Sequence, residues 1–296
     1  KVGLTALAGS LAAVSANAAE MTVSGATLLT YTSEDSTEVT GNPYGMKTNI
    51  GFTASGDVNG YTVSYMQTSV DQFAGMSSAR LSIDMGDMGT IAFDQGSGSG
   101  LATIDDKTPT AAEEIWDGLD NAAGDANGLV GAAGNSGVWN YISPAVGGIT
   151  SNIALRKGSG TSNADGASSG SGQSAWDIAV TGSGESVNVD GLAWGLGYGI
   201  AEAGEQTNTA GSQNEDEHST VFVNYSMGSV TAGIQMSKID KGGNAAKDQA
   251  VEAWGLAFNV NDDLSISYGE REIEYQGAGA TADVTEDGEG VAIAYT

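Results

Sequence analysis

Residues 192–200 read Leu-Ala-Trp-Gly-Leu-Gly-Tyr-Gly-Ile, so every second residue is large and apolar and each residue between is Gly or Ala. Because successive side chains of a β-strand point to opposite faces, this stretch predicts a strand with one apolar face and one face of small residues. The same alternation recurs along the chain, where Ser, Thr, Asn and Gln join Gly and Ala on the second face. We count fourteen such segments, of which residues 138–143 form the weakest and residues 291–296 the last.

The links between these segments alternate between short turns and long polar loops. The turns are rich in Gly, Asn, Asp and Pro, which tolerate turn dihedrals. They lie at residues 56–60, 86–89, 144–148, 182–191, 228–229 and 260–263, and the loops at 33–45, 70–76, 96–137, 157–173, 202–217, 239–249 and 276–288. A soluble sandwich has no reason to keep its long connections at one end, whereas the turns and loops of a transmembrane β-barrel face different compartments. The pattern therefore predicts an all-β, antiparallel up-and-down transmembrane barrel.

The composition excludes several other classes of protein. The formal net charge is −27 with only ten Lys and Arg, so no basic patch is available for nucleic acid. The chain has no cysteine, which removes disulfide, thiolate and zinc-thiolate chemistry. No apolar run is long enough for a helical membrane span. The single histidine, His218, follows an acidic loop, so we interpret it as an exposed residue at the rim of the barrel rather than as a general base. We therefore expect no enzymatic activity.

The two ends of the chain carry their own signals. Residues 1–18 resemble a secretory signal peptide, because a short apolar stretch is followed by Ala16-Asn17-Ala18, a small-x-small cleavage site. We therefore assign residues 19–296 to the barrel. The last segment, from residue 291, is short and is followed by no terminal aromatic strand, so we expect the C-terminal strands of the barrel to be missing.

Several short stretches in a fixed order resemble the general diffusion porins of Gram-negative outer membranes. They are Ala19-Glu20-Met21-Thr22-Val23-Ser24-Gly25, Gly56-Asp57, Gly86-Asp87-Met88-Gly89-Thr90, Ile91-Ala92-Phe93-Asp94, Asn224-Tyr225-Ser226-Met227-Gly228 and Leu264-Ser265-Ile266-Ser267-Tyr268-Gly269. No single stretch is specific to this family. Their order along the chain, together with the position of the longest loop as the third of the long loops, is a more specific signal. The resemblance covers essentially all of residues 19–296.

This resemblance implies a sixteen-stranded barrel, fourteen strands of which are visible here, that assembles as a homotrimer in the outer membrane. It also implies contact with membrane lipid and lipopolysaccharide, and passive diffusion of small hydrophilic solutes and ions. A barrel of about sixteen strands is too wide for its side chains to fill, so it encloses water. Two other hypotheses remain open from the residues alone: a secreted or surface-layer adhesin, and a soluble β-barrel that stores a ligand.

The third long loop, residues 96–137, carries seven acidic residues and one Lys107, a net charge of −6. Two interpretations are open from the residues: an acidic loop folded into the barrel, or an acidic loop in solvent. The resemblance favours the first, with a constriction formed by this loop. The candidate constriction residues are Asp105, Asp106, Glu113, Glu114, Asp117 and Asp120.

An acidic loop inside a pore calls for a basic wall opposite, and charged walls set ion selectivity. Four basic residues are in phase with the polar faces of their segments: Lys47, Arg80, Arg156 and Arg271. Because the acids are concentrated in one loop, we expect a preference for cations. We expect no cofactor and no ordered metal site. Asp117, Asp120, Asp125 and Asn127 offer oxygen ligands for loosely bound calcium, although the EF-hand spacing is absent.

Overall fold

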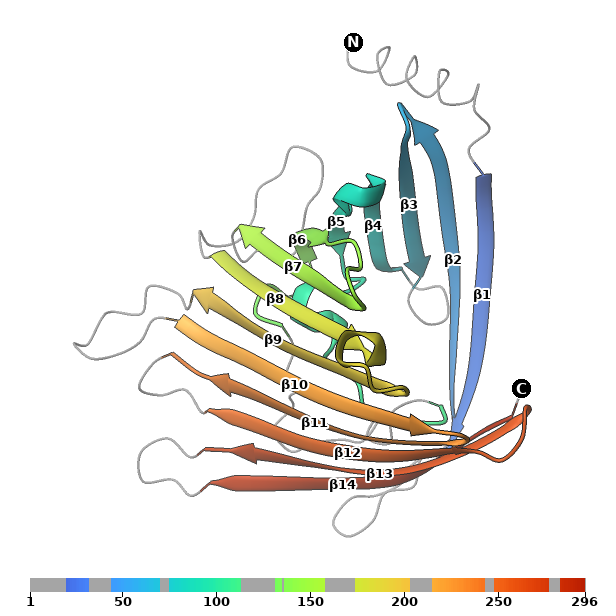
Figure 1. Cartoon of the computed structure of the whole chain (residues 1–296), viewed down its shortest axis with the longest axis vertical. Coiled ribbons are helices and arrows are strands. Elements are labelled where there is room, and N and C mark those ends of the chain that lie inside the picture. The colour runs from blue at the N-terminus through green and yellow to red at the C-terminus, as the bar shows by residue number, and fades with distance from the viewer. Residues whose placement is uncertain are drawn as a thin grey trace, which may run out of the picture. The chain divides into compact units, whose positions relative to one another are not determined.

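The computed structural model describes residues 20–31, 44–69, 75–112, 131–134, 136–157, 174–202, 215–242, 248–276 and 283–295. Residues 1–18, assigned above to a signal peptide, lie outside this range. Fourteen strands make up the fold, and their order in the sheet is their order in the chain (Figure 1). Neighbouring strands run antiparallel. The predicted number of strands and the up-and-down antiparallel order are confirmed.

The chain divides into two compact units, of which the first holds residues up to Ser97 together with Trp139–Pro144. Its strands are β1 (Glu20–Tyr31), β2 (Tyr44–Val58), β3 (Tyr61–Ser69), β4 (Met76–Asp84), β5 (Thr90–Gln95) and most of β6 (Ser136–Ile142). A 3-10 turn, η2 (Gly86–Met88), connects β4 and β5.

The second unit holds Gly98–Val138 and Ala145–Thr296. Its strands are β7 (Ile149–Lys157), β8 (Ser174–Ser183), β9 (Leu192–Glu202), β10 (Glu215–Met227), β11 (Val230–Asp240), β12 (Gln249–Asn259), β13 (Leu264–Tyr275) and β14 (Val284–Tyr295). Two 3-10 turns accompany them, η3 (Gly100–Thr103) in the third long loop and η4 (Gly184–Val187) between β8 and β9. In Figure 1 these strands lie side by side, with the short turns at one end of the sheet.

The short links are turns, as predicted. β10 and β11 are joined by Gly228 and Ser229 alone, and Gly228 has a φ of 62° that favours glycine. Between β12 and β13, Asn261 Oδ1 accepts the backbone N–H groups of Asp263 and Leu264 at 2.8 and 2.9 Å. Such side-chain bonds to a following backbone amide are the reason that Asn is common in turns.

The prediction for the last segment was wrong. We expected a strand that only begins at residue 291, but β14 has twelve residues and pairs with β13 from Tyr275↔Val284 to Leu264↔Tyr295. Residues 284–288 were assigned to a loop because they carry Glu286 and Asp287 in place of apolar residues. Backbone pairing needs no apolar side chain, so the strand continues beyond the apolar part of the sheet.

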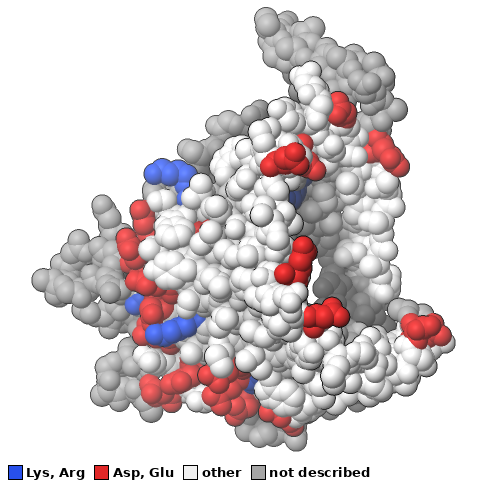
Figure 2. Space-filling model, viewed as in Figure 1, with Lys and Arg blue, Asp and Glu red and all other residues white. Residues whose placement is uncertain are grey.

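The two faces of the strands in the second unit differ in burial. Large apolar side chains such as Leu196, Val221 and Leu256 are exposed, whereas the intervening small and polar side chains are buried. Figure 2 shows the result, a strand wall that is mostly uncharged, with acidic residues toward both its loop side and its turn side. An exposed apolar band flanked by charge is what a lipid-facing barrel wall requires.

Aromatic residues are part of this outward face. Trp176 and Tyr198 form an edge-on pair with ring centroids 6.0 Å apart, and Trp254 and Tyr268 another at 5.5 Å. Each pair joins neighbouring strands, β8 to β9 and β12 to β13. Within the part of the chain that the structure describes, no helix is long and apolar enough to span a membrane.

Candidate functional site

The third long loop lies on the polar face of the second unit. Its described parts are residues 98–112, which we call the outgoing limb, and residues 131–134, which we call the return limb. The outgoing limb opens with η3, and Gly98 and Gly100 there have φ angles of 91° and 58°. These values favour glycine, so the local sequence Gly-Ser-Gly permits the chain to bend as it leaves the first unit.

Asp177 on β8 holds both limbs at once. Its Oδ1 accepts the backbone N–H of Leu101 at 3.0 Å, and its Oδ2 accepts that of Ala133 at 2.8 Å. On the neighbouring strand β7, Asn152 Oδ1 accepts the backbone N–H of Gly100 at 2.8 Å. The Asp177 side chain is fully buried, so a buried carboxylate is satisfied by two amides of the loop.

Farther along the outgoing limb, Gln235 and Asn224 bind the backbone around Lys107. Gln235 Oε1 accepts the Lys107 N–H at 2.7 Å, and Gln235 Nε2 donates to the carbonyl of Ile104 at 2.8 Å. Asn224 Nδ2 donates to the Lys107 carbonyl at 2.6 Å. Strands β10 and β11 therefore fix the backbone of Lys107 on both its donor and its acceptor side.

The outgoing limb reaches β13, where Ser267 Oγ accepts the N–H of Ala111 at 2.8 Å. Ser267 is buried at this contact. The limb therefore crosses from β7 and β8 to β13 by hydrogen bonds between strand side chains and loop backbone. In the second unit, the described limbs of the third loop are folded onto the small and polar face of the strands rather than extended away from it.

Glycines on the polar face make room for the loop. A Cβ built on Gly197 would clash with the Leu101 side chain, and one on Gly255 would lie 2.5 Å from the Pro109 carbonyl oxygen. A Cβ on Gly233 would meet Pro109 Cδ at 2.7 Å. The alternation of small residues that predicted the second face of the strands is thus also what lets the loop approach the backbone.

Apolar contacts support these hydrogen bonds. Leu101 and Ile104 of the outgoing limb pack with Ala179 of β8 and Phe222 of β10 in one buried cluster. Leu101 and Ile104 are almost completely buried, at 2% and 1% exposure. The loop therefore has an apolar side turned to the strand wall, and its backbone amides are paired there.

The structure places only two of the six candidate constriction residues. Asp105 and Asp106 lie half-buried on the outgoing limb, directly before Lys107. Glu113, Glu114, Asp117 and Asp120 lie outside the described residues, as do Asp125 and Asn127 of the possible calcium ligands. Among the described residues, no group of three or more His, Asp or Glu side chains is arranged to hold a metal ion.

The four candidate basic residues differ in their surroundings. Arg80 of β4 donates to Asn140 Oδ1 and, at 3.4 Å, to Ser97 Oγ, all within the first unit. Arg156 of β7 lies against the return limb, because a Cβ on Gly134 would be 2.9 Å from its Nη1. Arg271 of β13 is 4% exposed. Lys47 lies on β2 opposite Leu28 in the register.

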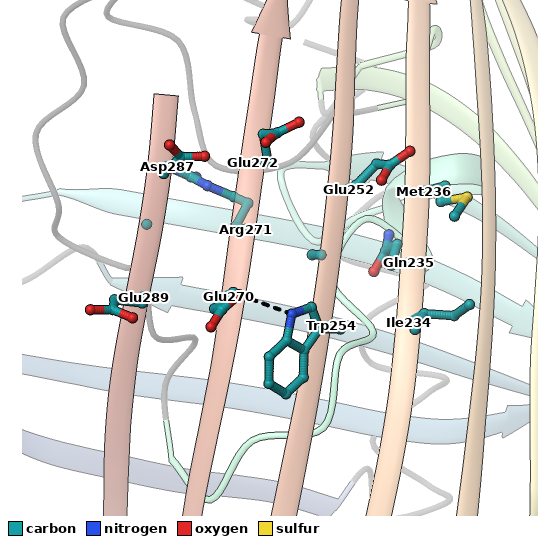
Figure 3. Close-up of a pocket in the computed structure, with 12 residues that line it drawn as sticks. Ile234, Gln235, Met236, Glu252, Trp254, Glu270, Arg271, Glu272, Asp287 and Glu289 are labelled. Atoms are coloured by element: carbon teal, nitrogen blue, oxygen red, sulfur yellow. Dashed lines mark hydrogen bonds between the residues drawn. The ribbon is translucent and has the colours of Figure 1, made fainter. Parts of the chain in front are cut away.

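Five carboxylates end the apolar band on the outward face of β12–β14 (Figure 3). Glu252, Glu272 and Asp287 occupy directly opposite positions on the three strands. Glu270 lies on the same face of β13 as Glu272, nearer the short turn that precedes this strand. It accepts hydrogen bonds from Trp254 Nε1 at 3.2 Å and from the Tyr268 hydroxyl at 2.6 Å. The aromatic residues thus stand between the apolar band and these charges.

Sequence reasoning missed the residues that hold the loop: Asn152, Asp177, Asn224, Gln235 and Ser267. A signal for one of them was present. Asp177 interrupts a run of small inward residues between Ala175 and Ala179, and an acid there needs partners, because a buried charge is costly when unpaired. The other four are ordinary polar residues of a polar face, and their partners are distant in sequence.

Comparison with known proteins agrees with this architecture. Residues 3–296 match the family model described as Gram-negative porin. Three solved structures resemble the fold, each with a TM-score above 0.5. A porin is 14% identical, with 92% of this chain and 89% of that one covered and a TM-score of 0.60. No curated protein sequence matches the chain.

Two further similar structures are named OmpF and OmpT, and the second is described as an outer membrane protein. OmpF of Salmonella typhi, in complex with daunomycin, is 12% identical over 90% of this chain and 82% of that one, with a TM-score of 0.58. OmpT of Vibrio cholerae, in a form that lacks loop L8, is 13% identical over 93% and 86%, with a TM-score of 0.57. At such low identity the likeness concerns the fold alone.

Proposed function

The chain belongs to the Gram-negative porin family, whose members are outer-membrane diffusion channels, and we therefore propose that it passes small hydrophilic solutes and ions. We propose further that the channel prefers cations. The solute gradient drives the transport, so no reaction and no catalytic residue is involved. The protein contributes a water-filled path, a size limit and a charge bias.

The observation that carries this proposal is the position of the third loop. Its outgoing limb is bound to strands β7, β8, β10, β11 and β13 on the face opposite the exposed apolar band. In a membrane barrel the face opposite the lipid is the lumen. A loop attached along that face narrows the channel, and solutes then pass between the loop and the rest of the wall.

The exposed apolar band argues against the secreted adhesin and against the soluble ligand-storage barrel. Large apolar side chains such as Leu196, Tyr225 and Leu256 are between 44% and 50% exposed on the outward face. A water-soluble protein rarely exposes a continuous apolar surface of this kind. A protein in a lipid bilayer requires one, because the bilayer core is itself apolar.

The proposed cation preference rests on the acids of the third loop. Asp105 and Asp106 directly precede Lys107, whose backbone is bound by Gln235 and Asn224, and this supports a fixed position for the two acids. Fixed charges act on passing ions within about one Debye length, ~8 Å at physiological salt. Acids at the narrowest part of the channel therefore have more effect than acids at the strand ends.

The test is the reversal potential of the full-length protein in a planar bilayer under a salt gradient. We expect a cation-selective channel whose selectivity falls when Asp105, Asp106, Glu113 and Glu114 are replaced by the corresponding amides. A matched control replaces Glu252, Glu272, Glu274 and Asp287, four outward-facing acids, by amides, and it should leave the selectivity unchanged. An anion-selective wild type, or equal effects of the two variants, would contradict the proposed role of the loop.

We also propose, from the family, export by the signal peptide at residues 1–18, a homotrimer, and contact with lipid and lipopolysaccharide. Native mass measurement of the full-length protein in detergent would test the trimer, and a monomer would count against it. The short turns are proposed to face the periplasm. A cysteine introduced at Ser171 should be labelled in intact cells and one at Asp87 should not, and the reverse result would invert this topology.

A further inference from the structure

The two limbs of the third loop meet at one side chain, although 32 residues separate Leu101 from Ala133. Both backbone amides donate to the carboxylate of Asp177, one to each oxygen. Of the chain between these two amides, the described residues 102–112 run along the strand wall, bound by β10, β11 and β13. A single carboxylate therefore closes the base of the loop.

The space around this carboxylate leaves no room for side chains at three neighbouring glycines. A Cβ on Gly100 or on Gly131 would clash with the Asp177 carboxylate, and one on Gly199 would clash with Asp177 Cβ. Each limb thus contributes a glycine at the point of closest approach, and the neighbouring strand β9 contributes a third. The sequence supplies three small residues around one acid, which indicates a fitted contact rather than a chance approach.

The hydrogen bonds farther along the loop are separate from this contact. Gln235 and Asn224 hold the backbone of Ile104 and Lys107 on β10 and β11. Neither residue bonds to Leu101 or Ala133 in the described contacts. The loop is consequently held at its base by β7 and β8 and, separately, along its outgoing limb by β10, β11 and β13.

We propose that Asp177 is a positioning residue that clamps the two limbs together and so keeps the channel steadily open, whereas Gln235 sets the distance of the outgoing limb from the wall and so the size limit. The functional half of this proposal rests on the proposed channel function. The structural half, the coupling of the two limbs through one carboxylate, does not depend on it.

Chemistry distinguishes the variants of Asp177. In Asp177→Ala both amides lose their acceptor, so both limbs are released. In Asp177→Asn one amide keeps an oxygen acceptor, but the other meets an N–H group that can only donate. Asn152→Ala removes the acceptor of the Gly100 amide and leaves both oxygens of Asp177 in place. Thr181→Val is the matched control, since Thr181 lies on the same face of β8 and makes no side-chain hydrogen bond to the described part of the loop.

Hydrogen exchange of backbone amides in the full-length protein, folded in detergent micelles, tests the clamp directly. A hydrogen bond to a charged group is among the stronger ones, so Asp177→Ala should speed exchange at both Leu101 and Ala133 by about tenfold or more. Asn152→Ala should speed exchange at Gly100 and leave Ala133 unchanged, and Thr181→Val should change none of the three. Release of one limb only by Asp177→Ala, or of neither, would overturn the clamp.

Circular dichroism shows from the strand content whether Asp177→Ala folds. If it does not fold, Asp177→Asn tests whether Asp177 clamps both limbs. It should speed exchange at one of the two amides and leave the other near its wild-type rate. Unchanged exchange at both amides would overturn the proposal.

Bilayer recordings then test the consequence for the channel. Asp177→Ala should increase current noise and closures without changing the largest neutral polyethylene glycol that enters, whereas Gln235→Ala should change that size limit. The same effect of both variants would refute the division of roles. A wild-type protein that conducts no ions would refute the proposed function, while the exchange result would still decide the clamp.

Discussion

Strand β1 of the first unit and strand β13 of the second carry the same two-face pattern, yet their surroundings differ. The described side chains of β1, at residues 20–27, are exposed on both faces. In β13 the outward Ile266 is exposed whereas the inward Ser267 is buried at its contact with Ala111 of the third loop. The alternation of residues thus defines two faces, but it does not by itself bury either.

What buries the polar face of the second unit is a loop rather than a second sheet. A loop satisfies its backbone only where side chains offer donors and acceptors, so the covered strands carry Asp, Asn, Gln and Ser on that face. It also needs room, which the glycines of β9, β11 and β12 provide. The residues on a strand face covered in this way are small or polar, as on an exposed face, although they are buried like the residues of a hydrophobic core.

The largest expected difference between substitutions concerns the outward face. Leu196→Arg on β9 should lower the free energy of unfolding in lipid by about 2–4 kcal/mol, because a cation near the bilayer midplane is poorly solvated. Leu81 on β4 of the first unit is similarly exposed, at 47% against 50%, so Leu81→Arg should cost as much if its wall also faces lipid. Urea titration in vesicles measures both.

Leu196→Ala and Leu81→Ala are the controls, since they remove apolar area without adding charge and should cost less than Arg. The alternative result is that Leu81→Arg leaves the free energy of unfolding at its wild-type value and abolishes the oligomer. That result would show that the first unit contacts a partner chain at the position where the second unit contacts lipid.

A smaller effect is expected from glycines. Gly255→Ala places a methyl group against the Pro109 backbone and should cost about 1–3 kcal/mol, as overpacking generally does. A Cβ at Gly25 on β1 would lie 3.2 Å from the Asn49 carbonyl oxygen and 3.8 Å from Ile50 Cγ1, so the effect of Gly25→Ala should stay within about 0.5 kcal/mol, as at most surface positions. Thermal unfolding in detergent would compare them, and equal losses would contradict a loop seated on Gly255.

The smallest expected effect is shared by the two units. Tyr141 donates to the Met88 carbonyl at 3.0 Å in the first unit, and Trp194 Nε1 donates to Ser186 Oγ at 3.0 Å in the second. Each bond secures a short turn, so Tyr141→Phe and Ser186→Ala should each lower stability by about 1 kcal/mol. Tyr61→Phe serves as the control, because no hydrogen bond of its hydroxyl is observed among the described residues. If Tyr61→Phe lowers stability as much as the two variants, the two hydrogen bonds do not stabilise the turns as we expect.

The sequence by itself determined the strands, the turns and the outward face. The period of two separates apolar from polar residues in each segment, and the Gly, Asn and Asp residues mark the turns, because both signals depend on neighbours in the chain. The same signal failed at β14, where Glu286, Asp287 and Glu289 continue a strand beyond the apolar band. Backbone pairing, which is independent of side-chain polarity, decides the end of that strand.

The position of the described limbs of the third loop follows from the folded structure and not from local sequence. Its seven acids left an inward and an outward position open, since charge alone fits both. The decision comes from Asp177, Gln235 and Ser267, which lie 76, 128 and 156 residues from the loop amides that they bind. Such distant partners leave no local pattern in the sequence, because each is an ordinary polar residue until the sheet brings it beneath the loop.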